Sequence, residues 1–175
     1  ILIEKGCKVN EMDASENSLL HLDLPEEYFG MLVNFGLNVN HKNKGNVTPL
    51  QKAIDAGNKN AVQILLENGA DAQHKDNREN SMFYVALVDK LNYDVYDLLC
   101  EFDSPNFDEA NTEGASMLFE YIRRLDNYSS ENSLKYLKKI TKTIWEDITR
   151  IIILITLKWN QFIFFYVMKR TYLIF

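Results

Sequence analysis

The sequence predicts an all-α solenoid in which short helix-turn-helix units stack side by side. The first observation is a pair of short amphipathic helices within residues 46–73. The second is a glycine after each pair, since Gly36 and Gly69 lie 33 residues apart. The third is that helix-start residues recur at the same spacing, as Thr48 and Ser81 do. Helices this short cannot bury both faces against each other, so each unit needs neighbours on both sides.

The most complete unit lies within residues 46–73. Thr48 can cap the first helix with its hydroxyl, and Pro49 follows at a position where a missing N–H costs nothing. Gly57 supplies the turn between the helices, and Gly69 suits a left-handed cap at the end of the second. The apolar stripes are formed by Leu50, Ala53 and Ile54 in the first helix and by Ala61, Val62, Leu65 and Leu66 in the second.

The 33-residue period and the Thr-Pro-Leu-x-x-Ala core of residues 48–53 closely resemble the ankyrin repeat. The resemblance covers Ile1 to about Tyr121 and extends at most to Ile140. It implies about four and a half stacked units with short β-hairpin loops. The residues that carry it are Thr48, Pro49, Leu50, Ala53, Gly57, Val62, Leu65, Leu66, Gly69, Ala70 and Asp71.

The array is expected to occupy residues 1–126, beginning with a partial first unit. The later units fall near residues 10–40, 41–73, 74–107 and 108–126, a last repeat helix or capping helix follows at 127–148, and an apolar tail at 149–175. The chain lacks an initiating Met and opens on the end of a second helix, which favours a fragment of a longer product.

Two units depart from the regular length. The second lacks three residues between its helices, because Gly6 and Gly36 are only 30 residues apart. The fourth places Lys90 where Gly57 is expected and Phe102 where Gly69 is expected. A left-handed backbone at either residue costs about 1 kcal/mol, so we expect these turns to be remodelled. The segment 103–107 adds two residues before the fifth unit.

The C-terminal region from residue 133 predicts an amphipathic helix that covers the end of the stack. Its apolar positions are Leu134, Leu137, Ile140, Ile144, Ile148, Ile151 and Ile155, with Lys135, Lys138, Lys139 and Lys142 on the other sides. A spanning helix in the tail would place Lys158 near its centre, at a cost of about 2.5 to 3.5 kcal/mol. Two explanations of the tail stay open: a hairpin of strands 151–157 and 162–168, or translated noncoding sequence. Basic membrane association through residues 134–175 is a further alternative.

Charge and residue pattern restrict the function. The chain up to Asp147 carries a net charge of −10 and the rest +4, which argues against nucleic acid as a partner. His41 and His74 lie one period apart, at about 10 Å, too far to share a metal ion. The resemblance gives His21 a hydrogen-bonding role. No phosphate loop, nucleophile elbow or zinc pattern occurs, so we expect no enzyme, cofactor or metal.

Protein recognition is the function that a stacked array favours, because loop tips and first helices form one extended concave surface. The predicted protein-binding residues are Lys42, Lys44, Gln51, Asp55, Lys75, Asn77, Arg78, Tyr84 and Asn111. The four cations Lys42, Lys44, Lys75 and Arg78 would form a positive patch suited to an acidic peptide. The resemblance implies a monomeric adaptor or scaffold in the cytoplasm or nucleus. The alternative is a targeting module of a larger kinase, ubiquitin ligase or poly-ADP-ribosyltransferase.

Overall fold

The computed structural model describes residues 9–107, 109–125, 132–133, 135–142 and 144. The chain divides into two compact units, Ile1–Asp126 and Asn127–Phe175, and each is described by itself.

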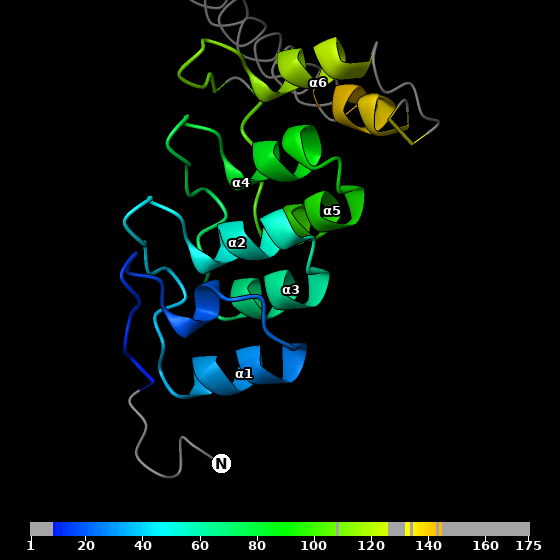
Figure 1. Ribbon diagram of the computed structural model, residues 1–175. Helices are drawn as coiled ribbons and strands as arrows, with labels where there is room; N and C mark the ends of the chain where they lie inside the picture. The colour runs from blue at the N-terminus through cyan, green and yellow to red at the C-terminus, as the bar shows by residue number, and fades with distance from the viewer. Residues whose placement is uncertain (1–8, 108, 126–131, 134, 143, 145–175) are drawn as a thin grey trace, which may run out of the picture. The chain divides into compact units, whose positions relative to one another are not determined.

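The first unit is a double row of short helices. In chain order these are η2 (Leu19–His21), α1 (Glu26–Asn34), α2 (Pro49–Ala56), α3 (Lys59–Glu67), α4 (Met82–Tyr84), η3 (Val85–Asp89), α5 (Tyr93–Phe102) and α6 (Met117–Leu125). One row contains η2, α2, the continuous α4 and η3, and α6, and the other contains α1, α3 and α5. The loops that connect one unit to the next extend together from one side of these rows (Figure 1). The predicted all-α solenoid is confirmed.

The unit formed by α2 and α3 follows the sequence prediction closely. The Thr48 Oγ1 accepts a hydrogen bond from the Gln51 N–H at 3.2 Å, and Gly57 and Gly69 adopt φ angles of 68° and 83°. Leu50, Ile54, Ala61, Val62 and Leu65 are completely or almost completely buried. Burying a large aliphatic side chain contributes about 1.5 to 3 kcal/mol, so packing between the rows stabilises helices that are too short to persist alone.

The loops contain four copies of one tight turn, here called finger turns, at residues 13–17, 43–47, 76–80 and 111–115. In each, the side-chain oxygen of the first residue accepts hydrogen bonds of 2.8 to 3.1 Å from the backbone N–H groups two and four positions later. Those first residues are Asp13, Asn43, Asp76 and Asn111, which are types that favour such turns. The expected β-hairpins are reduced, in the described residues, to the isolated antiparallel bridges Lys75–Ser81 and Ala110–Ser116.

The second unit of the array has only one turn of 3₁₀ helix, η2, where the next unit has the eight residues of α2. The three missing residues therefore come from the first helix itself. After η2 the chain is extended at Leu22, and Pro25 caps the start of α1. The end of α2 thus lacks the helical turn that would otherwise cover it.

The fourth unit is longer than predicted in its first helix. Residues Val85–Asp89 form a π-helix, which accommodates one extra residue. The second helix is consequently displaced by one position, and Asn92 caps α5 as Asn58 caps α3. The expected alignment of Lys90 with Gly57 was therefore wrong, because Leu91 occupies that place and takes the left-handed φ of 52°.

This displacement also changes the end of α5. Asp103, rather than Phe102, corresponds to Gly69, and its φ of −154° is extended. Leu99, rather than Leu98, corresponds to Leu65. Of the two additional residues assigned to segment 103–107, one lies in the π-helix and one in the loop. The turn after α5 is therefore remodelled, as predicted, whereas the turn before α5 keeps a left-handed residue at Leu91.

The described part of the second compact unit is helical over residues 135–142. Tyr136 and Ile140 are buried there. The four lysines Lys135, Lys138, Lys139 and Lys142 are exposed, as expected for an amphipathic helix. The remaining predicted apolar positions after residue 144, the whole apolar tail and the partial first unit up to residue 8 lie outside the described residues.

Candidate functional site

Neighbouring finger turns are joined by hydrogen bonds from their asparagine side chains. The Asn43 Nδ2 donates to the Asn17 Oδ1 at 2.6 Å, and the Asn111 Nδ2 donates to the Asn80 Oδ1 at 3.1 Å. Between the middle two turns, the Asn77 Nδ2 donates to the Gly45 carbonyl at 3.0 Å. These bonds hold the four turns in one continuous row.

Two histidines also hydrogen-bond to finger turns of the preceding unit. The Nε2 of His41 donates to the Glu16 carbonyl at 2.8 Å, and that of His74 donates to the Asn46 carbonyl at 2.9 Å. Both acceptors belong to the left-handed residue of the preceding finger turn. The pair therefore has a structural role, and no described group of three or more His, Cys, Asp or Glu residues is arranged to hold a metal ion.

His21 links its own helix start to the next finger turn. Its Nδ1 accepts a hydrogen bond from the Ser18 N–H at 3.2 Å, and its Nε2 donates to the Val47 carbonyl at 3.0 Å. Burial lowers the pKa of His21 below its ordinary value, because charging the ring requires desolvation. The neutral ring fits this arrangement, since Nδ1 must be unprotonated to accept.

The predicted positive patch is largely neutralised by carboxylates. Lys75 pairs with Glu109, a bond that raises the pKa of the lysine, and also approaches Glu79 at 3.7 Å. Arg78 pairs with Asp89 at 2.8 Å. Binding of an acidic peptide stays a prediction, but the patch presents much less unpaired positive charge than its sequence indicates.

The two remaining cations of the patch differ from each other. The Lys44 Nζ donates to the Ala14 carbonyl at 2.7 Å and lies 4.0 Å from a Glu16 carboxylate oxygen. Lys42 is exposed and makes no hydrogen bond or ion pair with a described residue. Among the described residues, Lys42 is therefore the one member of the patch whose charge can pair with a ligand without breaking another contact.

The other predicted binding residues also contribute to the framework. Asp55 pairs with Lys90 at 3.0 Å, and Asn77 and Asn111 make the finger bonds given above. Gln51 is half-buried, and its Oε1 has no hydrogen-bond partner among the described residues. Tyr84 is buried, with only 6% of its surface exposed, so it offers little area to a partner.

An ion-pair network that the sequence did not predict joins the fourth and fifth units. Asp89 lies between Arg78 and Arg124, at 2.8 and 3.1 Å, and its side chain is 17% exposed. Arg124 also donates to the Val88 carbonyl at 2.8 Å, a carbonyl within the π-helix. The only available signal was the extra residue in the fourth unit, and a count of residues does not locate it.

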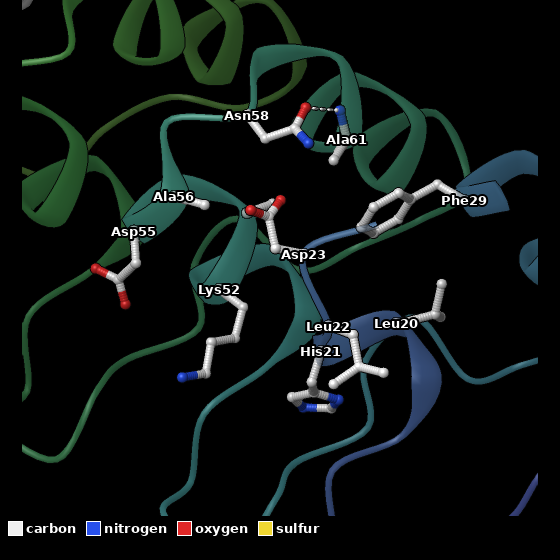
Figure 2. Close-up of a pocket in the computed structure, with 11 residues that line it drawn as sticks. Leu20, His21, Leu22, Asp23, Phe29, Lys52, Asp55, Ala56, Asn58 and Ala61 are labelled. Carbon is white, nitrogen blue, oxygen red and sulfur yellow. Dashed lines mark hydrogen bonds between the residues drawn. The ribbon is translucent and has the colours of Figure 1, made fainter. Parts of the chain in front are cut away.

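A cavity of about 350 Å³ lies where the first helix of the second unit is short. It is lined by Leu20, His21, Leu22, Asp23, Phe29, Lys52, Ala53, Asp55, Ala56, Asn58 and Ala61. Figure 2 shows α2 on one side and the segment after η2, with Asp23, facing it. The three-residue deficit predicted a short unit, but sequence reasoning missed the cavity that results.

Among the described residues, no helix is both long and apolar enough to cross a bilayer.

Comparison with known proteins identifies the repeat. Residues 1–76 and 25–111 match a family model described as ankyrin repeats in three copies. No curated protein was found to match the chain. The matched segments together span residues 1–111, which is more than half of the sequence, and they cover the helices from η2 to α5 and the first three finger turns. The chain therefore belongs to the ankyrin repeat family.

Proposed function

We propose that this chain is a non-catalytic adaptor or scaffold module that binds a partner protein on its finger turns and the adjoining face of the first helices. Ankyrin repeats are in general protein interaction modules and are typically non-catalytic, so the coarser part of this statement follows from the family. The finer part concerns the location of the binding surface in this chain.

The observation that supports the proposal is that different groups of the finger turns hold the fold and face the solvent. Backbone groups and the first residue of each turn hold its shape, and histidines fasten it to its neighbour. Some side chains beside or within the turns, such as Lys42 and Glu113, are exposed and make no hydrogen bond or ion pair with a described residue. A rigid row of turns that leaves some exposed side chains outside the folding contacts gives a preformed binding surface at low entropic cost.

A charge-exchange variant tests the location. Lys42→Glu combined with Glu113→Lys changes one exposed residue just before a finger turn and one within another, and it preserves the net charge. The matched control, Gln63→Glu with Glu101→Gln, makes a net-neutral exchange at exposed positions of the outer helices α3 and α5. Both variants should keep the circular dichroism and melting temperature of the parent.

Affinity capture from cell extract, quantified by mass spectrometry, provides the comparison. We expect the finger variant to recover at least about tenfold less of the main captured proteins than the parent does, while the outer-helix control recovers the same amount. A tenfold loss of affinity corresponds to roughly 1.4 kcal/mol of binding free energy. Equal capture by parent and finger variant, with loss in the control, would place the binding surface on the outer helices instead.

We place the module in the cytoplasm or nucleus, where a half-buried thiol such as Cys100 persists in its reduced form. Fractionation of cells that express a tagged chain tests this placement, and recovery in the secreted fraction would contradict it.

A further inference from the structure

The cavity beside η2 is a direct result of a shortened repeat. A regular first helix, such as the eight residues of α2, continues for a second turn, whereas η2 stops after three. The chain then runs extended through Leu22 to Pro25, whose φ of −55° suits the start of α1. The missing turn leaves Ala56 exposed, so the cavity opens at the C-terminal end of α2.

The cavity has an apolar floor and an accessible rim. Leu20, Phe29 and Ala61 form part of the floor and are buried by the surrounding fold. At the rim, Leu22 is 45% exposed and Ala56 is also exposed. The volume of about 350 Å³ falls within the range of about 300 to 1,000 Å³ typical of ligand pockets. The apolar floor of the cavity favours the burial of a large apolar side chain against it.

The charges around the rim are mainly negative. Asp23 lines the cavity, and neither it nor Glu27 makes a hydrogen bond or ion pair with a described residue. Glu26 accepts only from an uncharged group, the Asn60 amide at 2.6 Å. Asp55 is already paired with a lysine.

Two lysines, Lys52 in the lining and Lys59 at the start of α3, partly offset these carboxylates. The wider surface remains acidic, since the described residues between 9 and 125 include nineteen acidic and nine basic side chains. The long-range field therefore favours a cationic ligand over an anionic one.

We propose that this groove binds a segment of a partner protein in which one large apolar side chain enters the cavity and an adjacent Lys or Arg pairs with Asp23. The inference rests on the proposed function in requiring a protein partner. It concerns a separate surface, because the groove lies at the C-terminal end of α2 and the finger turn precedes its N-terminal end. Eight helical residues separate the two ends by about 12 Å.

Nuclear magnetic resonance with defined peptides tests the chemistry of the occupant. The probes are three twelve-residue Gly/Ser peptides with one central Phe, flanked by Arg, by Ser or by Glu. We expect the Arg peptide to shift the amides of Leu22, Asp23, Ala56 and Asn58, and to bind at least about fivefold more tightly than the Glu peptide. Absence of shifts at these amides at millimolar peptide, or equal affinity for the Arg and Glu peptides, would overturn the proposal.

Two substitutions separate the apolar and charged contributions. Ala56→Leu fills the cavity from the exposed rim and should lower the affinity for the Arg peptide by at least about tenfold. Gln63→Leu, on the exposed face of α3, is the control and should leave this affinity unchanged. Asp23→Lys should reverse the preference between the Arg and Glu peptides. Undiminished binding to Ala56→Leu, with its amide spectrum otherwise intact, would mean that the cavity is not the site.

A second copy of this chain is the competing occupant, and analytical ultracentrifugation distinguishes it. Dimerisation of the parent that Ala56→Leu abolishes would overturn the proposal, whereas a monomer across concentrations supports it. The two proposals fail separately. If no peptide binds the parent, only the groove proposal is rejected. If the Lys42→Glu, Glu113→Lys variant captures the same proteins from extract as the parent, only the finger-surface proposal is rejected.

Discussion

Replacing Glu79 with glycine is expected to stabilise the protein. Glu79 adopts a left-handed φ of 61°, and the corresponding position of the last finger turn is Gly114, with φ of 76°. Relief of left-handed strain contributes about 1 to 2 kcal/mol. Greater freedom of glycine in the unfolded chain offsets about 0.4 to 1 kcal/mol of this gain.

A second, smaller loss comes from the ion pair between Glu79 and Lys75. The atoms are 3.7 Å apart and the two side chains are 57% and 30% exposed, so solvent screens the pair and its loss has only a small effect. The net expectation is a gain of about 0.5 kcal/mol. Urea denaturation should show a higher midpoint with an unchanged slope.

Two control variants make this expectation refutable. Glu79→Gln removes the ion pair but keeps the strain, so it should be slightly less stable than the parent. Glu113→Gly places glycine at an exposed position of another finger turn that is not among the left-handed residues, and should lose about 0.5 kcal/mol. If Glu79→Gly proves no more stable than Glu79→Gln, the left-handed conformation does not strain the chain and the reasoning fails.

Two further predictions concern buried polar groups. Because burial lowers the pKa of His21, its neutral ring contributes stability above about pH 6.5 that is progressively lost as the pH falls below this value. Urea midpoints at pH 7.5 and 5.0 should differ less in His21→Gln than in the parent, and an equal difference would exclude His21 as the cause. Asp89→Asn should cost about 2 kcal/mol, because Arg78 and Arg124 lose their shared carboxylate at a site that is partly buried. Arg78 is more exposed than Arg124, so Arg78→Ala should cost less than Arg124→Ala in the same denaturation assay, and the reverse order would contradict the burial argument.

The sequence predicted those parts of the fold that depend on local chemistry. Thr48 caps α2, and Gly57 and Gly69 adopt left-handed turns, because few other residue types satisfy these positions. Apolar spacing likewise identified the buried faces of α2 and α3. These features repeat from unit to unit, so periodicity reveals them without knowledge of the tertiary structure.

Features that arise from a change in unit length were harder to predict. A spacing of 33 residues aligns Ala86 with Ala53, and it also aligns Leu98 with Leu65, although only the first correspondence is structural. Both leucines of α5 are buried, so the apolar pattern tolerates a displacement of one residue. The ion pairs of Asp89 with Arg78 and Arg124 depend on that displacement, so residue spacing did not predict them.

Predictions for the candidate binding surface were limited by a different cause. Lys75 and Arg78 were assigned from their place in the repeat, but their charge is compensated by residues up to 34 positions away, such as Glu109. Sequence spacing predicts which side chains reach the inner face. It does not predict which of them already have partners in the neighbouring unit.

The two irregular units indicate where this array tolerates change. Both alterations of the first helix, the shortening at η2 and the π-helix at Val85–Asp89, occur toward its C-terminal end. The N-terminal end cannot change length as readily, because the finger turn and its histidine clamp fix it to the preceding unit. A lost turn leaves a cavity, and an added residue creates an acceptor at Val88 and brings Asp89 to two arginines. The features that distinguish this chain from a regular array therefore lie at the helix ends away from the fingers, where we expect partner specificity to be altered without loss of stacking.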